Sequence, residues 1–128
     1  MQSRILFVSG HPEDAQQLSG MLHPLPVVVD HVQSVRHARS QLLQELYDVV
    51  LTEAALPDGK WLDVLHLVRE HPRQLAVIVT APHADDKLWA EVLNLGAYDV
   101  IVQPFYEPEV LRIVQNACTP ETHVLSAV

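Results

Sequence analysis

The amino-acid sequence predicts an α/β fold of the doubly wound type, with five parallel strands in one open sheet and helices on both faces. Three observations predict it. Apolar runs of strand length alternate with helical patterns along the chain, which is typical of successive βαβ units. The runs are continuously apolar, as expected for strands covered on both faces. Turn and capping residues separate the successive elements.

The five apolar runs are the expected strands. They comprise residues 5–8, 27–29, 48–52, 76–79 and 99–102. Right-handed crossovers between parallel strands bring their carboxyl ends to one edge of the sheet, where ligands of such folds bind near the topological switch point. The residues that close or follow the strands at this edge are the candidates for a functional site. They are Ser9, Gly10, Glu53, Thr80 and Gln103.

The helices are predicted from apolar residues at a 3.6-residue period and from start and stop signals. Pro12 fits the first turn of the first helix, Ser34 caps the second, a turn at 56–59 precedes the third, Asp85 or Asp86 starts the fourth, and the fifth begins near Pro108. Gly96 is well placed to end the fourth helix. The positions expected to face the sheet are Leu18, Met21 and Leu22; Val35, Ala38, Leu42 and Leu46; Leu62, Leu65 and Val68; Leu88, Val92 and Leu95; and Val110, Leu111 and Val114.

The length and composition fit one soluble domain. A chain of 128 residues is within the usual size of a single domain, and we place it at residues 1–118, with 119–128 as a C-terminal tail without clear periodicity. We expect no membrane span, because no long apolar window lacks charge. The apolar stretch at the N-terminus is too short for a signal peptide, so we expect a cytoplasmic protein.

Charge and cysteine content exclude other classes. The formal net charge is −8 and the eight Lys and Arg are scattered, so we expect no direct binding to nucleic acid. Cys118 is the only cysteine, which excludes an internal disulfide and a thiolate metal cluster.

Several motifs in a fixed order carry a resemblance to a known family. They are residues 47–53 (YDVVLTE), 56–59 (LPDG), 77–81 (VIVTA), 96–99 (GAYD) and 103–105 (QPF). With these motifs the sequence resembles the receiver domains of two-component response regulators, the CheY-like family, over about residues 4–117. The resemblance implies a flavodoxin-like sheet with strand order 2-1-3-4-5, and a cis peptide before Pro104.

The resemblance also assigns roles to the strand-end positions. In the family, two acidic residues after the first strand hold a divalent metal together with an aspartate that accepts phosphate from a histidine kinase. A Thr or Ser and a Lys bind the phosphoryl oxygens. The matching positions here are Ser9 and Gly10, Glu53, Thr80 and Gln103, and only Thr80 agrees with the family pattern.

These departures predict a signalling module that is not an enzyme and has no cofactor, with Mg²⁺ binding lost or weak. We expect it to act through protein contacts that do not depend on phosphate. Glu53 either mimics a phosphorylated aspartate by reaching toward Thr80 or, as we slightly favour, is simply solvated at an abandoned site. Two alternatives stay open: weak phosphorylation of Glu53, and sensing of a small ligand in the emptied crevice.

The eight histidines show no compact metal motif, so we assign no metal site. His11 is a partial exception, because it lies beside the crevice and is followed by Glu13 and Asp14, which together offer an unconventional cation site. Its expected role is at the start of the first helix, where the two acids complement the helix dipole.

The resemblance places the interaction surface on the fourth helix, fifth strand and fifth helix. The residues that we expect on this face are Lys87, Trp89, Glu91, Val100, Tyr106 and Arg112. Val100 stands where the family often has an aromatic switch residue. The expected partner is another protein or an attached output domain, with a homodimer as one form. We expect Trp61 to be a packing residue.

Overall fold

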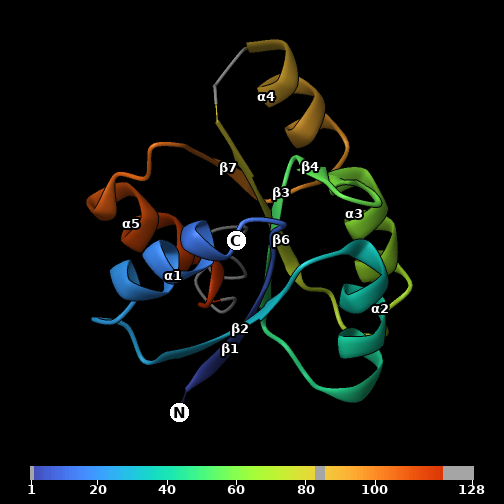
Figure 1. Ribbon diagram of the computed structural model, residues 1–128, viewed down its shortest axis with the longest axis horizontal. Coiled ribbons are helices and arrows are strands. Elements are labelled where there is room, and N and C mark those ends of the chain that lie inside the picture. Colours follow the sequence, from blue (N-terminus) through green and yellow to red (C-terminus); the bar gives the residue numbers. More distant parts are fainter. Residues whose placement is uncertain (1, 83–85, 120–128) are drawn as a thin grey trace, which may run out of the picture.

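The computed structural model describes residues 2–82 and 86–119 (Figure 1). One parallel sheet has the order β2-β1-β3-β6-β7, which confirms the expected doubly wound 2-1-3-4-5 arrangement. Its strands are β1 (Ser3–Val8), β2 (Val27–Val32), β3 (Val49–Glu53), β6 (Ala76–Ala81) and β7 (Asp99–Val102). Asp85 and residues 120–128 of the expected tail lie outside the described residues, so the domain boundary stays a prediction.

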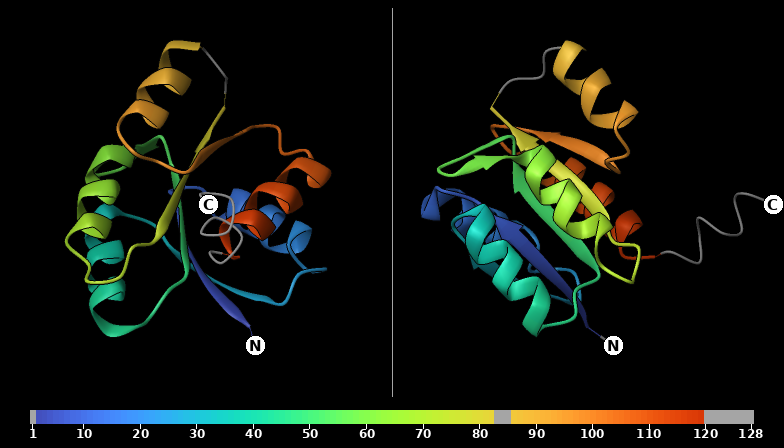
Figure 2. Two further views of the ribbon diagram at one scale, coloured as in Figure 1. Left: turned by 180° about the vertical axis from the view of Figure 1, so that it is seen from behind. Right: turned by 90° about the vertical axis from the view of Figure 1, so that its right-hand side faces the viewer.

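Two helical layers cover the sheet. The helices are α1 (Pro12–Met21), α2 (Val35–Gln44), α3 (Trp61–Arg69), α4 (Asp86–Asn94) and α5 (Glu107–Ala117). The apolar residues of α1 and α5 form one core with one face of the sheet, and those of α2, α3 and α4 form another with the opposite face. Figures 1 and 2 show the twisted sheet between these layers.

The local signals in the sequence agree with the helix ends. Pro12 is at the first position of α1, and the Ser34 hydroxyl accepts the His37 N–H at the start of α2. Gly96 has φ of 104°, a left-handed conformation that only glycine adopts at little cost. The Gln103–Pro104 peptide is cis, as the resemblance implied.

Two of the expected inward positions are wrong. Leu46 is 65% exposed, because α2 ends at Gln44 and the chain is already extended at Glu45. Leu95 is also exposed, because α4 ends at Asn94 and the chain turns there toward Gly96. In both cases the apolar period continues in the sequence after the helix itself has ended.

The turn at residues 56–59 lies in a small antiparallel ribbon that the sequence did not predict. Its strands are β4 (Ala55–Leu56) and β5 (Gly59–Lys60). Between them, Asp58 accepts the backbone N–H groups of Val35 and Arg36 and so ties the ribbon to the start of α2. Among the described residues, no helix has the length and apolar character needed to cross a bilayer.

Candidate functional site at the carboxyl edge of the sheet

The fold brings the strand-end residues to one edge, as predicted. Glu53 and Thr80 are paired in register on β3 and β6, and both are buried. A cavity of about 400 Å³ opens beside them. Its walls are His11, Asp14, Glu53, Ala54, Ala55, Thr80, Pro82 and Gln103.

The Glu53 carboxylate is held by the loop between β1 and α1. The Gly10 N–H donates to Oε1 at 2.9 Å, and His11 Nδ1 lies 3.1 Å from both Oε1 and Oε2. Glu53 is only 6% exposed, so the expectation of a solvated side chain is wrong. Among the described residues, the carboxylate makes charge-assisted hydrogen bonds with Gly10 and His11 and none with Thr80, so the expected reach of Glu53 toward Thr80 is not formed.

Ser9 shapes this loop and does not extend into the cavity. Its hydroxyl accepts the His11 N–H at 3.0 Å and donates to the His11 carbonyl at 3.1 Å. The ring of His31 on β2 hydrogen-bonds the Ser9 carbonyl at 2.8 Å. These bonds fix the turn that leads into α1 and place the imidazole of His11 over Glu53.

His11 has a larger role in this site than the sequence pattern indicated. The hydrogen bond with Glu53, followed by the charge of that carboxylate, raises the pKa of the exposed His11 imidazole. Asp14, one turn into α1, places Oδ2 3.9 Å from His11 Nδ1. The acid that joins His11 is therefore Asp14 and not Glu13; the helical offset from His11 to Asp14 was the available signal.

The Thr80 hydroxyl is buried and, within the part of the chain that the structure describes, its Oγ1 has no hydrogen-bond partner. Thr80 is 1% exposed and lies in the cavity wall. A buried polar atom without a partner is rare and costly, so this hydroxyl is available to hydrogen-bond a water or a bound group in the cavity.

Gly10 lies under a proline of the β4–β5 ribbon. A Cβ atom at position 10 would lie 3.2 Å from Cγ and Cδ of Pro57. This is closer than ordinary van der Waals contact, so a side chain at position 10 requires Pro57 to shift.

The expected interaction face is only partly accessible. Tyr106 is strongly exposed, and Lys87, Glu91 and Arg112 are exposed as well. Trp89 is half-buried against the core between α2, α3 and α4, as expected for a residue beside the inward stripe. Val100 is only 2% exposed, so its place on an interaction surface is wrong. It lies inside β7 and packs in that same core.

Trp61 is buried at the start of α3, which confirms its packing role. Leu93 of α4 is exposed near Leu95, and no pattern in the sequence marks it.

Comparison with known proteins identifies one family. The family model of the response regulator receiver domain matches residues 5–115 of this chain. The response regulator protein PilR of Pseudomonas aeruginosa is 28% identical over 104 residues, which are 80% of this chain and 23% of PilR. The chain therefore spans less than a quarter of the length of this relative.

Solved structures show the same fold. The signal receiver domain of a Luxo repressor protein from Vibrio parahaemolyticus superposes with a TM-score of 0.88 at 20% identity, over 98% of each chain. The beryllofluoride-activated NtrC4 receiver domain dimer gives a TM-score of 0.83 at 21% identity, over 91% of this chain and 97% of that one.

Proposed function

Because the chain belongs to the response regulator receiver domain family, we propose that it is a receiver that signals through protein contacts without being phosphorylated. The observation that supports this most directly is the engagement of Glu53. The carboxylate at the phospho-acceptor position is buried, accepts the Gly10 N–H and faces the His11 imidazole with both oxygens. An acceptor oxygen must instead be free to attack phosphorus.

The residues of the site do not fit the Mg²⁺ ion that the family uses. Mg²⁺ requires near-octahedral coordination by oxygen. Ser9 uses its hydroxyl within the β1–α1 loop and Gly10 has no side chain, so Glu53 is the sole carboxylate among the three positions. Gln103 is neutral and supplies no charge to stabilise a transferring phosphoryl group. We therefore propose no phosphoryl transfer and no enzymatic step.

In this proposal the hydrogen bonds of Glu53 connect the end of β3 to the β1–α1 loop. The Gly10 N–H and the imidazole of His11 hold the carboxylate in the place where a phosphorylation cycle would change the charge. These hydrogen bonds form within the chain, so the proposed contact surface does not depend on phosphorylation by a kinase.

The proposed contact surface consists of the exposed parts of α4 and α5. Trp89 and Tyr106 supply aromatic area, and Lys87, Glu91 and Arg112 surround it with mixed charge, which favours specificity over raw affinity. The partner is a protein, an attached output domain or a second copy of this chain. The net charge of −8 disfavours nucleic acid.

The test uses beryllofluoride, an analogue of the phosphoryl group, with Mg²⁺. We expect the amide NMR spectrum around Glu53, Thr80 and Gln103, and the mass from light scattering, to be the same with and without the analogue. Saturable shifts at these residues that require both Mg²⁺ and beryllofluoride, or a change of mass, would contradict the proposal.

A further inference from the structure

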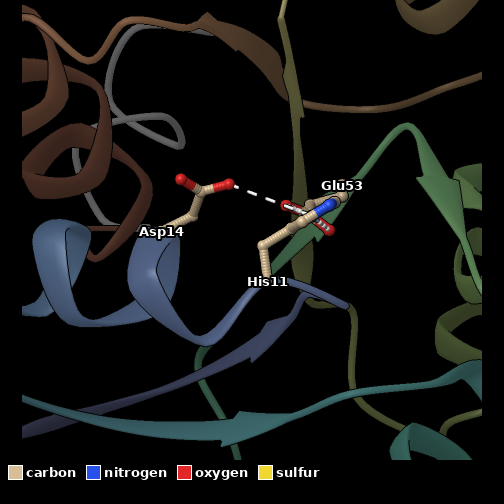
Figure 3. A group of neighbouring side chains, drawn as sticks. All are labelled: His11, Asp14 and Glu53. Atoms are coloured by element: carbon tan, nitrogen blue, oxygen red, sulfur yellow. Dashed lines mark hydrogen bonds and ion pairs between the residues drawn. The ribbon is translucent and has the colours of Figure 1, made fainter.

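Three side chains from two elements meet at the mouth of the cavity. His11 and Asp14 come from the start of α1, and Glu53 comes from the end of β3 (Figure 3). One ligand atom from each lies within 4.8 Å of the others. An imidazole nitrogen and two carboxylates form a mixed donor set of a kind that transition metals accept.

The distances agree with a shared ion. With metal–ligand bonds of roughly 2.0–2.2 Å, two ligand atoms on one tetrahedral ion lie about 3.3–3.6 Å apart. His11 Nδ1 is 3.1 Å from the Glu53 oxygens, slightly below this range, and 3.9 Å from Asp14 Oδ2, slightly above it. Asp14 lies in the first turn of α1 and its side chain is 30% exposed, which leaves it room to rotate and shorten the longer distance.

The local charge also favours a cation. Two carboxylates face the cavity, and its described lining residues include no Lys or Arg. A divalent ion would neutralise both acids at once. A metal-binding imidazole nitrogen carries no proton, so the ion would take the place of a proton on His11.

A second, independent observation points to a bound group. The Thr80 Oγ1 atom is buried in the wall of the same cavity and, among the described residues, has no partner. Three protein ligands leave a fourth position on a tetrahedral ion open toward the cavity. A water or an anion in that position would have the Thr80 hydroxyl available as a hydrogen-bond partner.

We propose that His11, Asp14 and Glu53 form a binding site for a divalent first-row transition metal of the Zn²⁺ type. The site differs from the Mg²⁺ site of the family in its ligands, because the acidic positions after β1 are Ser9 and Gly10 here. The imidazole shifts the preference from Mg²⁺ toward Zn²⁺, Co²⁺ and Ni²⁺. Metal binding replaces the direct contact between His11 and Glu53.

The experiment is a titration of the full chain, prepared without a polyhistidine tag, with Co²⁺ as the spectroscopic probe. We expect ligand-field absorption bands that saturate at one ion per chain, that Zn²⁺ abolishes and that excess Mg²⁺ leaves unchanged. The absence of saturable bands, or their loss in Mg²⁺, would overturn the proposal.

Variants assign the ligands. His11→Gln and Asp14→Asn should each weaken binding at least about tenfold, since losing a residue that merely supports a metal ligand already costs about 10–100-fold in affinity. Two matched controls, His66→Gln on α3 and Glu13→Gln beside Asp14, should bind like the parent. Thermal melting of each variant checks that it is folded. Unchanged binding in folded His11→Gln, or equal losses in the controls, would place the metal elsewhere and refute the site.

This test is separate from that of the proposed function. A receiver that fails to bind Co²⁺ can still be insensitive to beryllofluoride. Conversely, a receiver that responds to beryllofluoride with Mg²⁺ can still bind Co²⁺ through His11.

Discussion

His11 Nδ1 lies 3.1 Å from both carboxylate oxygens of Glu53, so an imidazole of the same chain contacts the side chain at the position that matches the phospho-acceptor of the family. The Ser9 hydroxyl and the Gly10 N–H complete the loop that makes this possible. In the proposed function, this loop conformation keeps the Glu53 carboxylate from accepting a phosphoryl group.

Replacing Glu53 should destabilise the protein even though the residue is charged. In Glu53→Ala the Gly10 N–H loses its acceptor, and we expect the free energy of unfolding to fall by about 1–3 kcal/mol. Glu53→Gln retains an acceptor oxygen and should lose less. Urea denaturation measures both, with Glu70→Ala at the exposed end of α3 as the control. A Glu53→Ala variant as stable as the parent would show that the hydrogen bonds of Glu53 contribute nothing to the free energy of unfolding.

Rebuilding the family pattern should restore some affinity for Mg²⁺. Ser9→Asp, Gly10→Asp, Glu53→Asp and Gln103→Lys together supply the missing groups, but a side chain at position 10 meets the ring of Pro57.

We therefore expect the quadruple variant to bind Mg²⁺ weakly, and a fifth change, Pro57→Ala, to improve binding by relieving this contact. Isothermal calorimetry measures both. If the folded five-residue variant shows no heat of Mg²⁺ binding, the assignment of these positions is wrong.

Asp58 should make the stability depend on pH in the acid range. Hydrogen bonds from the Val35 and Arg36 N–H groups lower the pKa of Asp58 below its ordinary value of 3.8. A group whose pKa is lower in the folded state than in the unfolded chain stabilises the fold at pH values above its unfolded-state pKa. This stabilisation is lost as the pH falls through the folded-state pKa.

In Asp58→Asn, the unfolding free energy at neutral pH should therefore be lower, and it should fall less steeply below about pH 4. Denaturation at a series of pH values checks this, with Glu70→Gln as a control that also removes one charge. Parallel curves for parent and Asp58→Asn would refute the role of this carboxylate.

Trp89→Ala should weaken association more than folding. The ring is half-buried against the α2–α4 core, so a small loss of thermal stability is expected along with the loss of contact area. Light scattering or partner capture measures the association, and melting measures the fold. Leu43→Ala on the exposed side of α2 is the control. If the folded Trp89→Ala variant keeps every association of the parent, the surface lies elsewhere.

The sheet could be predicted from the sequence because the signals that specify it are local and recur in each βαβ unit. Continuous apolar strands, Pro12, Ser34 and Gly96 each agree with one arrangement, and the motif order added the cis Pro104. The exposed Leu46 was missed because periodicity does not mark where a helix ends unless a stop signal is present.

The site was predicted in its position but not in its contacts. The strand ends correctly located Glu53 and Thr80, since parallel strands end at one edge. The partner of Glu53 depends on how the β1–α1 loop folds, which Ser9 decides through hydrogen bonds to its own neighbours. Such bonds follow from backbone geometry and have no signature in residue spacing.

The most direct measurement of the central claim is the intact mass of the protein after incubation with acetyl phosphate and Mg²⁺. We expect no gain in mass, because the Glu53 carboxylate is engaged within the chain and the positions that would hold Mg²⁺ and the phosphoryl oxygens are Ser9, Gly10 and Gln103. A mass gain of one phosphoryl group that hydroxylamine removes, and that is lost in Glu53→Ala, would contradict it.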